Sequence, residues 1–210
     1  MTSTPVGREP AVARGTRLPR TARRQQLLAA AQEVFVAQGY HAAAMDDIAE
    51  RAGVSKPVLY QHFPGKLELY LALLDQHATD LVEKVRQALD STTDNRQRVE
   101  ASVAAYFDFV AGDGEAFRLV FESDLRNDPS VRRRVERMTK ECVEAIARTI
   151  AHDTGAREDE ALLLSVGLTG LAEVGARWWL ASGGRIPQDR AVELLVGLSW
   201  RGLSGTPRTG

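Results

Sequence analysis

Residues 39–66 read GYHAAAMDDIAERAGVSKPVLYQHFPGK and contain two short helical patterns separated by a tight turn. The turn falls at residues 52–55, where Gly53 can adopt the left-handed backbone conformation that the chain reversal requires. Six apolar residues are spaced so that they can pack across the two helices: Met45, Ile48, Ala49, Val54, Leu59 and Phe63. Two short helices joined in this way predict a helix-turn-helix.

The packing of these apolar residues leaves one face of the second helix open to solvent. That face carries Lys56, Pro57, Tyr60 and Gln61. A helix presented in this way fits the major groove of DNA, where its early residues meet base edges and flanking polar groups hold phosphates. The pattern therefore predicts a DNA-binding domain; the alternative is a helical hairpin with no role in DNA binding.

Charge is distributed unevenly along the chain. Residues 1–66 contain nine Lys or Arg and five acidic residues, a net charge of +4, whereas the rest of the chain carries −5. Five arginines follow one another without an intervening acid, as expected of an arm attracted to phosphates: Arg14, Arg17, Arg20, Arg23 and Arg24. We expect Arg17 and Arg20 to contact DNA; a merely solvated, disordered tail is the alternative.

The motif resembles the TetR family of bacterial regulators in several neighbouring segments. They are Gly39-Tyr40, Asp47-Ile48-Ala49, residues 52–56 (AGVSK), residues 59–63 (LYQHF) and Lys66. The resemblance implies three DNA-binding helices, a fourth helix leading to a divergent effector domain, and dimerisation through the last two helices. It also implies phosphate contacts from Ser55, Lys56, Tyr60, His62 and Lys66, and base contacts from Lys56, Pro57, Val58 and Gln61.

The sequence departs from the family at Ala43 and Ala44, where threonines are usual. A threonine hydroxyl there caps the helix and touches phosphate, so a cap worth about 1 kcal/mol is absent. The departure fits the FasR-type regulators of actinobacteria, which residues 53–74, 92–99, 117–125 and 200–204 also resemble. That subgroup controls fatty acid synthesis and responds to long-chain acyl-CoA, so the resemblance implies such an effector.

Prolines and glycines divide the rest of the chain into helices. Proline is tolerated in the first turn of a helix and costs about 3 kcal/mol inside one, whereas glycine is common just after a helix ends. Nine helices are expected, over residues 20–38, 45–52, 56–62, 65–90, 95–111, 115–125, 129–152, 157–182 and 188–203. The expected fold is all-α, with a disordered basic arm (1–19), a three-helix helix-turn-helix domain (20–64) and an antiparallel effector-binding and dimerisation bundle (65–210).

The long helices after residue 65 have wide apolar faces, so the bundle can be solid or can contain a cavity. We expect the chain of a long-chain acyl-CoA there, although core packing is the alternative for each candidate contact. The candidates are Val103, Ala104, Phe107, Val110, Phe117, Val120, Phe121, Met138, Cys142, Ile146, Leu168, Leu171 and Trp178. Arg118, Arg126 and the arginines at 132–134 can meet a charged head group or can simply be solvated. A repressor of an efflux or catabolic gene that responds to another hydrophobic small molecule is the alternative function.

The last two expected helices have more apolar residues than one core-facing side of each helix would need. We expect a homodimer interface at Leu162, Val166, Gly170, Leu194, Leu195 and Leu198. Small residues at 167, 170, 172 and 175 would allow helices to approach closely there, although a contact within the chain would use the same residues. A two-fold dimer predicts a palindromic operator in double-stranded DNA.

Other functions find little support in the sequence. The single cysteine and four scattered histidines give no cluster with zinc-ligand spacing, and there is no phosphate-binding glycine loop or nucleophile motif. We therefore expect no enzyme activity, catalytic residue, metal or cofactor, and the basic N-terminal part disfavours an adaptor that binds only protein. No apolar run approaches the roughly 20 residues of a membrane span or has the form of a signal peptide, so a cytoplasmic protein without a membrane partner is expected.

Overall fold

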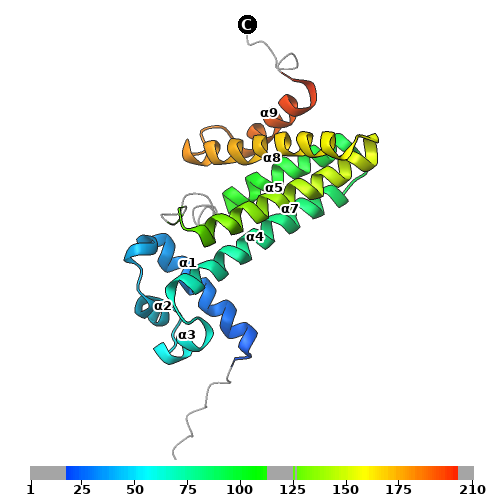
Figure 1. The fold of residues 1–210 in the computed structure, drawn as a ribbon. Helices are drawn as coiled ribbons and strands as arrows, with labels where there is room; N and C mark the ends of the chain where they lie inside the picture. The colour runs from blue at the N-terminus through cyan, green and yellow to red at the C-terminus, as the bar shows by residue number, and fades with distance from the viewer. Residues whose placement is uncertain (1–17, 113–124, 126, 203–210) are drawn as a thin grey trace, which may run out of the picture.

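The computed structural model describes residues 18–112, 125 and 127–202, and within these ranges the chain is all-helical (Figure 1). The helices are α1 (Arg20–Ala42), α2 (Met45–Arg51), α3 (Lys56–His62), α4 (Lys66–Asp90), α5 (Asn95–Gly112), α7 (Pro129–Thr154), α8 (Glu158–Ala181) and α9 (Gln188–Arg201). The predicted all-α class is confirmed, with eight helices in the described residues. The helix expected over 115–125 lies, apart from Leu125, outside the described residues.

The first three helices pack around a small core at one end of the molecule (Figure 1). Ile48 of α2 and Leu59 of α3 are fully buried, and Leu27 of α1 is buried with them in the same apolar cluster. Gly53 lies in the turn between α2 and α3 with a φ of 63°, the left-handed conformation that the sequence predicts for it. Gly39 has a φ of 78° and interrupts the helical backbone near the end of α1. These two glycines set the directions of the short helices.

The long helix α4 leads from this domain into the bundle. Its first turns contact α1, and the rest packs against α5 and α7 (Figure 1). Leu69, Leu73, Leu81 and Val85 recur at helical spacing along its buried face. Asp75 adds a polar link to α7, because it accepts hydrogen bonds from Arg134 Nε at 3.0 Å and from Arg137 Nη2 at 2.9 Å.

Helices α8 and α9 complete the bundle on the side away from the first three helices (Figure 1). α8 packs against α5 and α7, whereas α9 crosses α5 and also contacts α8. Where α8 meets α9, a Cβ atom on Gly175 of α8 would lie 2.4 Å from Cδ1 of Leu195 on α9, so the glycine permits this close approach. A Cβ at Gly167 or Gly170 would meet nothing within 4 Å among the residues that the structure describes. The small residues of α8 therefore divide between a contact within the chain and an open face.

The ends of α7 follow the predicted use of proline and glycine. Asp128 caps the N-terminus, since its side chain accepts hydrogen bonds from the backbone N–H groups of Ser130 at 2.7 Å and Val131 at 3.3 Å, and Pro129 occupies the first turn. Gly155 ends the helix with a φ of 69°. Among the described helices, none is both long enough and apolar enough to cross a membrane.

Candidate DNA-binding surface and effector cavity

The outer face of α3 is open, as the sequence predicts for a helix that enters a DNA groove. Ser55, Lys56, Pro57, Tyr60 and Gln61 are exposed, with 47% of Tyr60 accessible. Val58 and His62 are half-buried at the side of the same helix. Pro57 in the first turn leaves the helix start unhindered, because the backbone N–H that proline lacks has no partner within the helix there. The arrangement places the base-reading and phosphate-contacting candidates of α3 on one accessible surface.

Lys56 does not project freely from this surface. Its Nζ lies 2.5 Å from Asp46 Oδ2 of α2, and both side chains are more than half exposed. The hydrogen bond to Asp46 raises the pKa of Lys56, so the ammonium group stays charged at neutral pH. An exposed pair of this kind contributes little stability. The pair therefore orients the lysine at the start of α3, and the DNA contact of Lys56 stays a prediction.

A basic groove lies beside α3, where the N-terminal end of α1 comes close to it. Leu18, Arg20, Arg23, Val58, Gln61 and His62 line this hollow of about 400 Å³. Burial, followed by the charges of Arg20, Arg24 and Arg23, lowers the pKa of His62. The positive charges of these three arginines repel a further cation and attract an anion such as a DNA phosphate. Arg20, predicted to contact DNA, thus lies next to α3, whereas Arg17 is outside the described residues.

Two contacts that the sequence analysis missed hold the helix-turn-helix against α1. Gln26 Nε2 donates a 2.7 Å hydrogen bond to the carbonyl oxygen of Ala52, in the turn between α2 and α3. Arg51 pairs with Glu33 of α1. Both contacts join residues 18 or more positions apart in the sequence, and helical periodicity carries no signal for them. They fix the position of α2 and the following turn relative to α1.

Lys66 has a different setting from the one that the resemblance implied. Its Nζ donates hydrogen bonds to the carbonyl oxygens of Tyr40 at 2.8 Å, His41 at 3.1 Å and Ala43 at 2.8 Å. A lysine ammonium group has three N–H donors, so all three are used. The side chain is engaged at the corner between α1 and α2, and the phosphate contact that the resemblance implies for Lys66 stays a prediction.

The bundle contains a cavity of about 300 Å³ in its half farther from the DNA-binding domain. Its walls come from the end of α4, the first three turns of α5, the last turns of α7, the middle of α8 and the end of α9. Among the predicted ligand contacts, Val103, Ile146 and Leu168 line this cavity. The structure thus locates the hollow nearer the distal end of the bundle than the sequence analysis expected.

The other ligand candidates have different surroundings. Phe107, Val110, Met138 and Cys142 are buried in the core outside the cavity wall, and Ala104 and Leu171 are half-buried away from it. Trp178 is 62% exposed on α8. Phe117, Val120 and Phe121 lie outside the described residues, as do Arg118 and Arg126. The arginines at 132–134 belong to the first turns of α7, whereas the cavity is lined by its last turns.

Several cavity-lining residues were missed, because sequence spacing shows which helix face is apolar but not where two faces leave space. They include Ser102, Tyr106, Ile150, Leu164 and Trp200. Ser102 is buried, and its hydroxyl oxygen has no hydrogen-bond partner within the described part of the chain. Burial raises the pKa of Tyr106 well above its usual value and that of the neighbouring Cys142 to about 11. At neutral pH both groups are uncharged, which suits an apolar interior.

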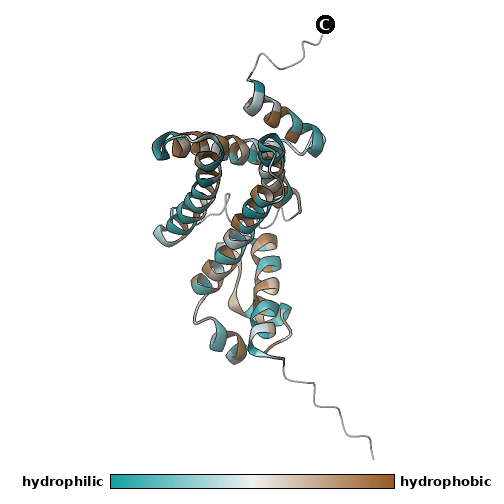
Figure 2. Cartoon of the chain, turned by 90° about the vertical axis from the view of Figure 1, so that its right-hand side faces the viewer, coloured by the Kyte–Doolittle hydropathy of each residue, from teal (hydrophilic) through white to brown (hydrophobic). Residues whose placement is uncertain are grey.

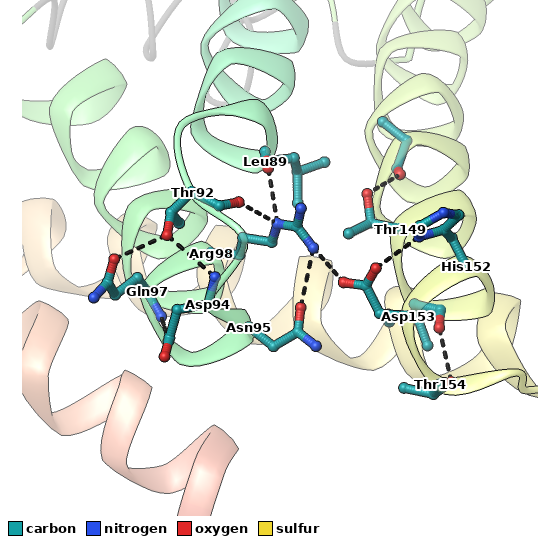
Figure 3. Close-up of polar contacts among 12 residues, drawn as sticks. Leu89, Thr92, Asp94, Asn95, Gln97, Arg98, Thr149, His152, Asp153 and Thr154 are labelled. Carbon is teal, nitrogen blue, oxygen red and sulfur yellow. Dashed lines mark hydrogen bonds and ion pairs between the residues drawn. The ribbon is translucent and has the colours of Figure 1, made fainter.

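One end of the cavity is polar, at the place where α4 ends, α5 begins and α7 ends (Figure 3). Arg98 Nε donates hydrogen bonds to the carbonyl oxygens of Leu89 at 2.9 Å and Thr92 at 2.7 Å, and its guanidinium also pairs with Asp153 of α7. A 2.8 Å hydrogen bond with His152 and the charge of Arg98 lower the pKa of Asp153. This network fastens three helices together beside the cavity rim.

An apolar surface covers parts of α8 and α9. Its larger side chains are more than a third exposed: Leu163, Val166, Val174, Trp178, Leu194, Leu198 and Trp200. Figure 2 shows apolar residues along α9, the helix that leads to the C-terminus. Of the predicted interface residues, Val166, Leu194 and Leu198 are exposed, the Cβ position of Gly170 is open, and Leu162 and Leu195 are half-buried.

The exposed recognition helix, the basic groove beside it and the long helix to a hollow bundle define a helix-turn-helix transcription regulator rather than an enzyme. Two family profiles match the chain: residues 27–73 match "Bacterial regulatory proteins, tetR family" and residues 95–202 match "Tetracyclin repressor-like, C-terminal domain". The chain belongs to the TetR family.

Individual relatives extend this result. The chain is 53% identical over 196 residues to the HTH-type transcriptional activator FasR of Mycolicibacterium smegmatis, covering 93% of this chain and 90% of the relative. Among solved structures, a TetR-like regulator from Rhodococcus sp. RHA1 is 30% identical, with a TM-score of 0.71 over 90% of this chain and all of the other. FadR from Bacillus subtilis, in complex with stearoyl-CoA, has a TM-score of 0.71 at 18% identity over 85% of this chain and 98% of the other.

Proposed function

We propose that this TetR-family regulator controls genes of fatty acid or lipid metabolism and that a long-chain acyl-CoA alters its affinity for DNA. The observation that carries the proposal is the cavity of about 300 Å³, apolar along most of its length and polar at one end. The high identity to FasR over nearly the whole chain supports the same function. FadR of B. subtilis shows that a bundle of this fold can hold stearoyl-CoA.

The lining of the cavity suits an amphiphile with a long chain. Val99, Val103, Ile146, Ile150 and Leu168 form apolar walls, and burying each methylene of a chain against such walls gains about 0.8 kcal/mol. The thioester carbonyl or another polar group of the ligand can accept a hydrogen bond from the buried hydroxyl of Ser102, which supplies a donor inside the cavity.

The polar end gives the ligand a direction. Asn95, Arg98, Thr149 and Thr154 lie there, so we place the head group at this end and the end of the chain toward Ala172. Asp153 already neutralises Arg98, and the hydroxyls of Thr149 and Thr154 donate hydrogen bonds to the carbonyl oxygens of Ala145 and Ile150. The side-chain amide of Asn95 can therefore donate to the head group. Only a ligand that binds one conformation of the protein better than another can change its affinity for DNA.

We further propose that the protein binds a palindromic operator as a homodimer through α8 and α9. Both helices pack against the rest of the bundle, yet each exposes large apolar side chains. These are Val174 and Trp178 on α8 and Leu198 on α9, which are 37–62% exposed. A second copy would remove them from water and would hold two recognition helices about one DNA turn, or roughly 34–36 Å, apart. Leu198→Glu should dissociate the dimer in sedimentation experiments at micromolar concentration. A wild-type protein that sediments as a monomer would contradict this part of the proposal.

The acyl-CoA proposal is tested by titrating protein–operator complexes with acyl-CoAs of increasing chain length. The operator is first selected from random duplex DNA by the wild-type protein. The effective acyl-CoA concentration should fall as the chain lengthens, until the cavity is full. A flat response at every length would exclude acyl-CoA sensing. A response to another apolar compound alone would favour the alternative, a repressor of an efflux or catabolic gene.

A matched pair of variants locates the ligand. Ala172 lines the cavity, whereas Ala104 is half-buried outside it. Ala172→Leu should shorten the longest acyl chain that the protein accepts, because the added atoms occupy the cavity. Ala104→Leu should leave the chain-length profile unchanged. Equal effects of the two substitutions would place the ligand elsewhere.

A further inference from the structure

Lys66 is the first residue of α4, and its side chain reaches back to the corner between α1 and α2. The three carbonyl oxygens that it binds belong to Tyr40, His41 and Ala43. Its Nζ also lies 4.6 Å from the centre of the Tyr40 ring, within the range of a cation–π interaction. The ammonium group therefore joins the start of the lever helix to residues 40–43 through four contacts.

The backbone at the corner is irregular. Gly39 has left the helical conformation, and α2 begins after Ala44 without a side-chain cap. Carbonyl groups at a helix C-terminus carry partial negative charge and lack partners within the helix. A cation from α4 satisfies these carbonyls at the point where the backbone turns toward α2. The direction of α2, and with it that of α3, therefore depends on a side chain of α4.

Aromatic packing links the same two elements. Tyr70 lies one turn beyond Lys66 on α4, and its ring is 5.2 Å from that of Tyr40, edge to face. Both rings also contact Phe35 of α1, at centroid distances of 5.8 Å for Tyr40 and 5.4 Å for Tyr70. Tyr70 and Phe35 are buried. Because one face of α4 holds Tyr40 by charge and by ring contact, a displacement of α4 moves the corner with it.

We propose that Lys66 is a positioning residue that couples α4 to the helix-turn-helix through three backbone carbonyls, and that it is not a phosphate anchor. The coupling to a ligand rests on the proposed acyl-CoA response. The role in DNA binding is independent of that response, because it depends only on whether the ammonium group contacts carbonyl oxygens or phosphate. The two statements can therefore be tested separately.

The first test is the dependence of DNA affinity on salt. Each phosphate contact that is lost lowers the slope of log affinity against log salt concentration by about 0.9. Lys66→Met keeps the length of the side chain but removes the charge, and it should leave this slope unchanged while weakening binding. Lys56→Met, at the exposed start of α3, is the matched control and should lower the slope by about 0.9.

The substitution Lys66→Arg further distinguishes a positioning role from a phosphate contact. Arginine is a strong phosphate ligand, so Lys66→Arg should restore both affinity and slope if the residue contacts phosphate. Three carbonyls that converge on one nitrogen suit a compact ammonium group better than a planar guanidinium, so a positioning role predicts incomplete rescue. A slope lowered by Lys66→Met and restored by Lys66→Arg would overturn the proposal.

The second test measures coupling as the ratio of operator affinities with and without saturating stearoyl-CoA. In Lys66→Met this ratio should fall to within about two-fold of unity, from a wild-type value in the usual range of about 5- to 150-fold. Direct binding of stearoyl-CoA, measured by calorimetry, should be unchanged, because the cavity is at the far end of α4. An undiminished ratio would refute the coupling role.

Tyr40→Leu provides a second variant in case Lys66→Met does not fold. It removes the ring contacts while leaving the lysine charge in place, and it should lower the coupling ratio without changing the salt slope. A lower slope in this variant would contradict the proposal. If the wild-type protein does not respond to stearoyl-CoA, the proposed function and the coupling role fail together, and the salt slopes still decide whether Lys66 contacts phosphate.

Discussion

The DNA-binding domain and the effector bundle are built from the same kind of amphipathic helix, yet they use their interiors differently. α2 and α3 have seven residues each, too few to be stable alone, and buried side chains and contacts to backbone carbonyls fix their positions. The bundle helices have 14–26 residues and enclose a cavity whose buried Ser102 hydroxyl has no partner in the described part of the chain. Short helices depend on tight fixation by their neighbours, as suits a surface predicted to read DNA, whereas longer helices can leave space for a ligand.

The largest expected difference between the two regions is the cost of removing a leucine side chain. Leu59 of α3 is fully buried, so Leu59→Ala should reduce the free energy of unfolding by about 3 kcal/mol and abolish DNA binding. Leu168 is half-buried and faces the cavity, so Leu168→Ala should cost less, about 2 kcal/mol, at the low end of the range for such substitutions. Urea unfolding followed by circular dichroism measures both values. Equal costs would show that the bundle is packed as tightly as the DNA-binding domain.

A smaller effect is expected from the polar network at the far end of the bundle. The guanidinium of Arg98 contacts the carbonyl oxygens of Leu89 and Thr92 and the carboxylate of Asp153. Arg98→Met removes all of these contacts. Because the Arg98 and Asp153 side chains are only 17% and 16% exposed, the free energy of unfolding should fall by about 2 kcal/mol. The control is Arg190→Met in the exposed Arg190–Glu193 pair, where a change below about 0.5 kcal/mol is expected. If the two variants are equally stable, the network does not hold the bundle end.

On the DNA-binding side, two neighbouring residues of α3 should have different effects. Gln61→Ala should alter the preference among variant operators by about 1 kcal/mol or more at one base pair, because base contacts specify sequence. Tyr60→Ala should weaken binding to all operators by a similar factor, because phosphate contacts position the helix. Affinities for a panel of single-base operator variants distinguish the two. Unchanged relative affinities in Gln61→Ala would exclude a reading role for this glutamine.

The smallest expected effect concerns pH. Burial and the nearby arginines hold the pKa of His62 below its usual value of 6.5, so the ring is neutral at pH 7.5. A phosphate in the basic groove favours the protonated ring, and DNA affinity should therefore rise a few-fold as the pH falls from 7.5 to 6. His62→Gln should remove this increase while leaving affinity at pH 7.5 nearly unchanged. A pH dependence identical in the variant would show that His62 does not titrate against DNA.

Helix ends were predictable because they depend on nearby residues. The predicted starts at residues 20, 45, 56, 95, 129 and 188 agree with the structure, since Pro57 and Pro129 and the cap at Asp128 act within one turn. The exposed face of α3 was predictable for the same reason, because a seven-residue helix with buried Leu59 has only one side left for solvent. The family resemblance added the prediction that this surface reads DNA.

Long-range contacts had no comparable signal. Gln26 and Ala52 are 26 residues apart, as are Lys66 and Tyr40, and nothing in the periodicity of either helix predicts that the side chain of one meets a carbonyl of the other. The hydrogen bonds of Lys66 at the corner between α1 and α2 were therefore not predicted. Gly175 illustrates the same limit, because its neighbour Leu195 belongs to another helix.

The sequence by itself determined the all-helical class, the position of the helix-turn-helix and the polar face of α3, because these follow from spacing and from residues that act within a few positions. Only the tertiary structure decided which apolar residues surround space and which fill it. Phe107 and Val103 are equally apolar and lie on the same helix, yet only Val103 lines the cavity. The reason is that a cavity is a property of several helices at once, set by their crossing angles and close approaches, and no single helix encodes it.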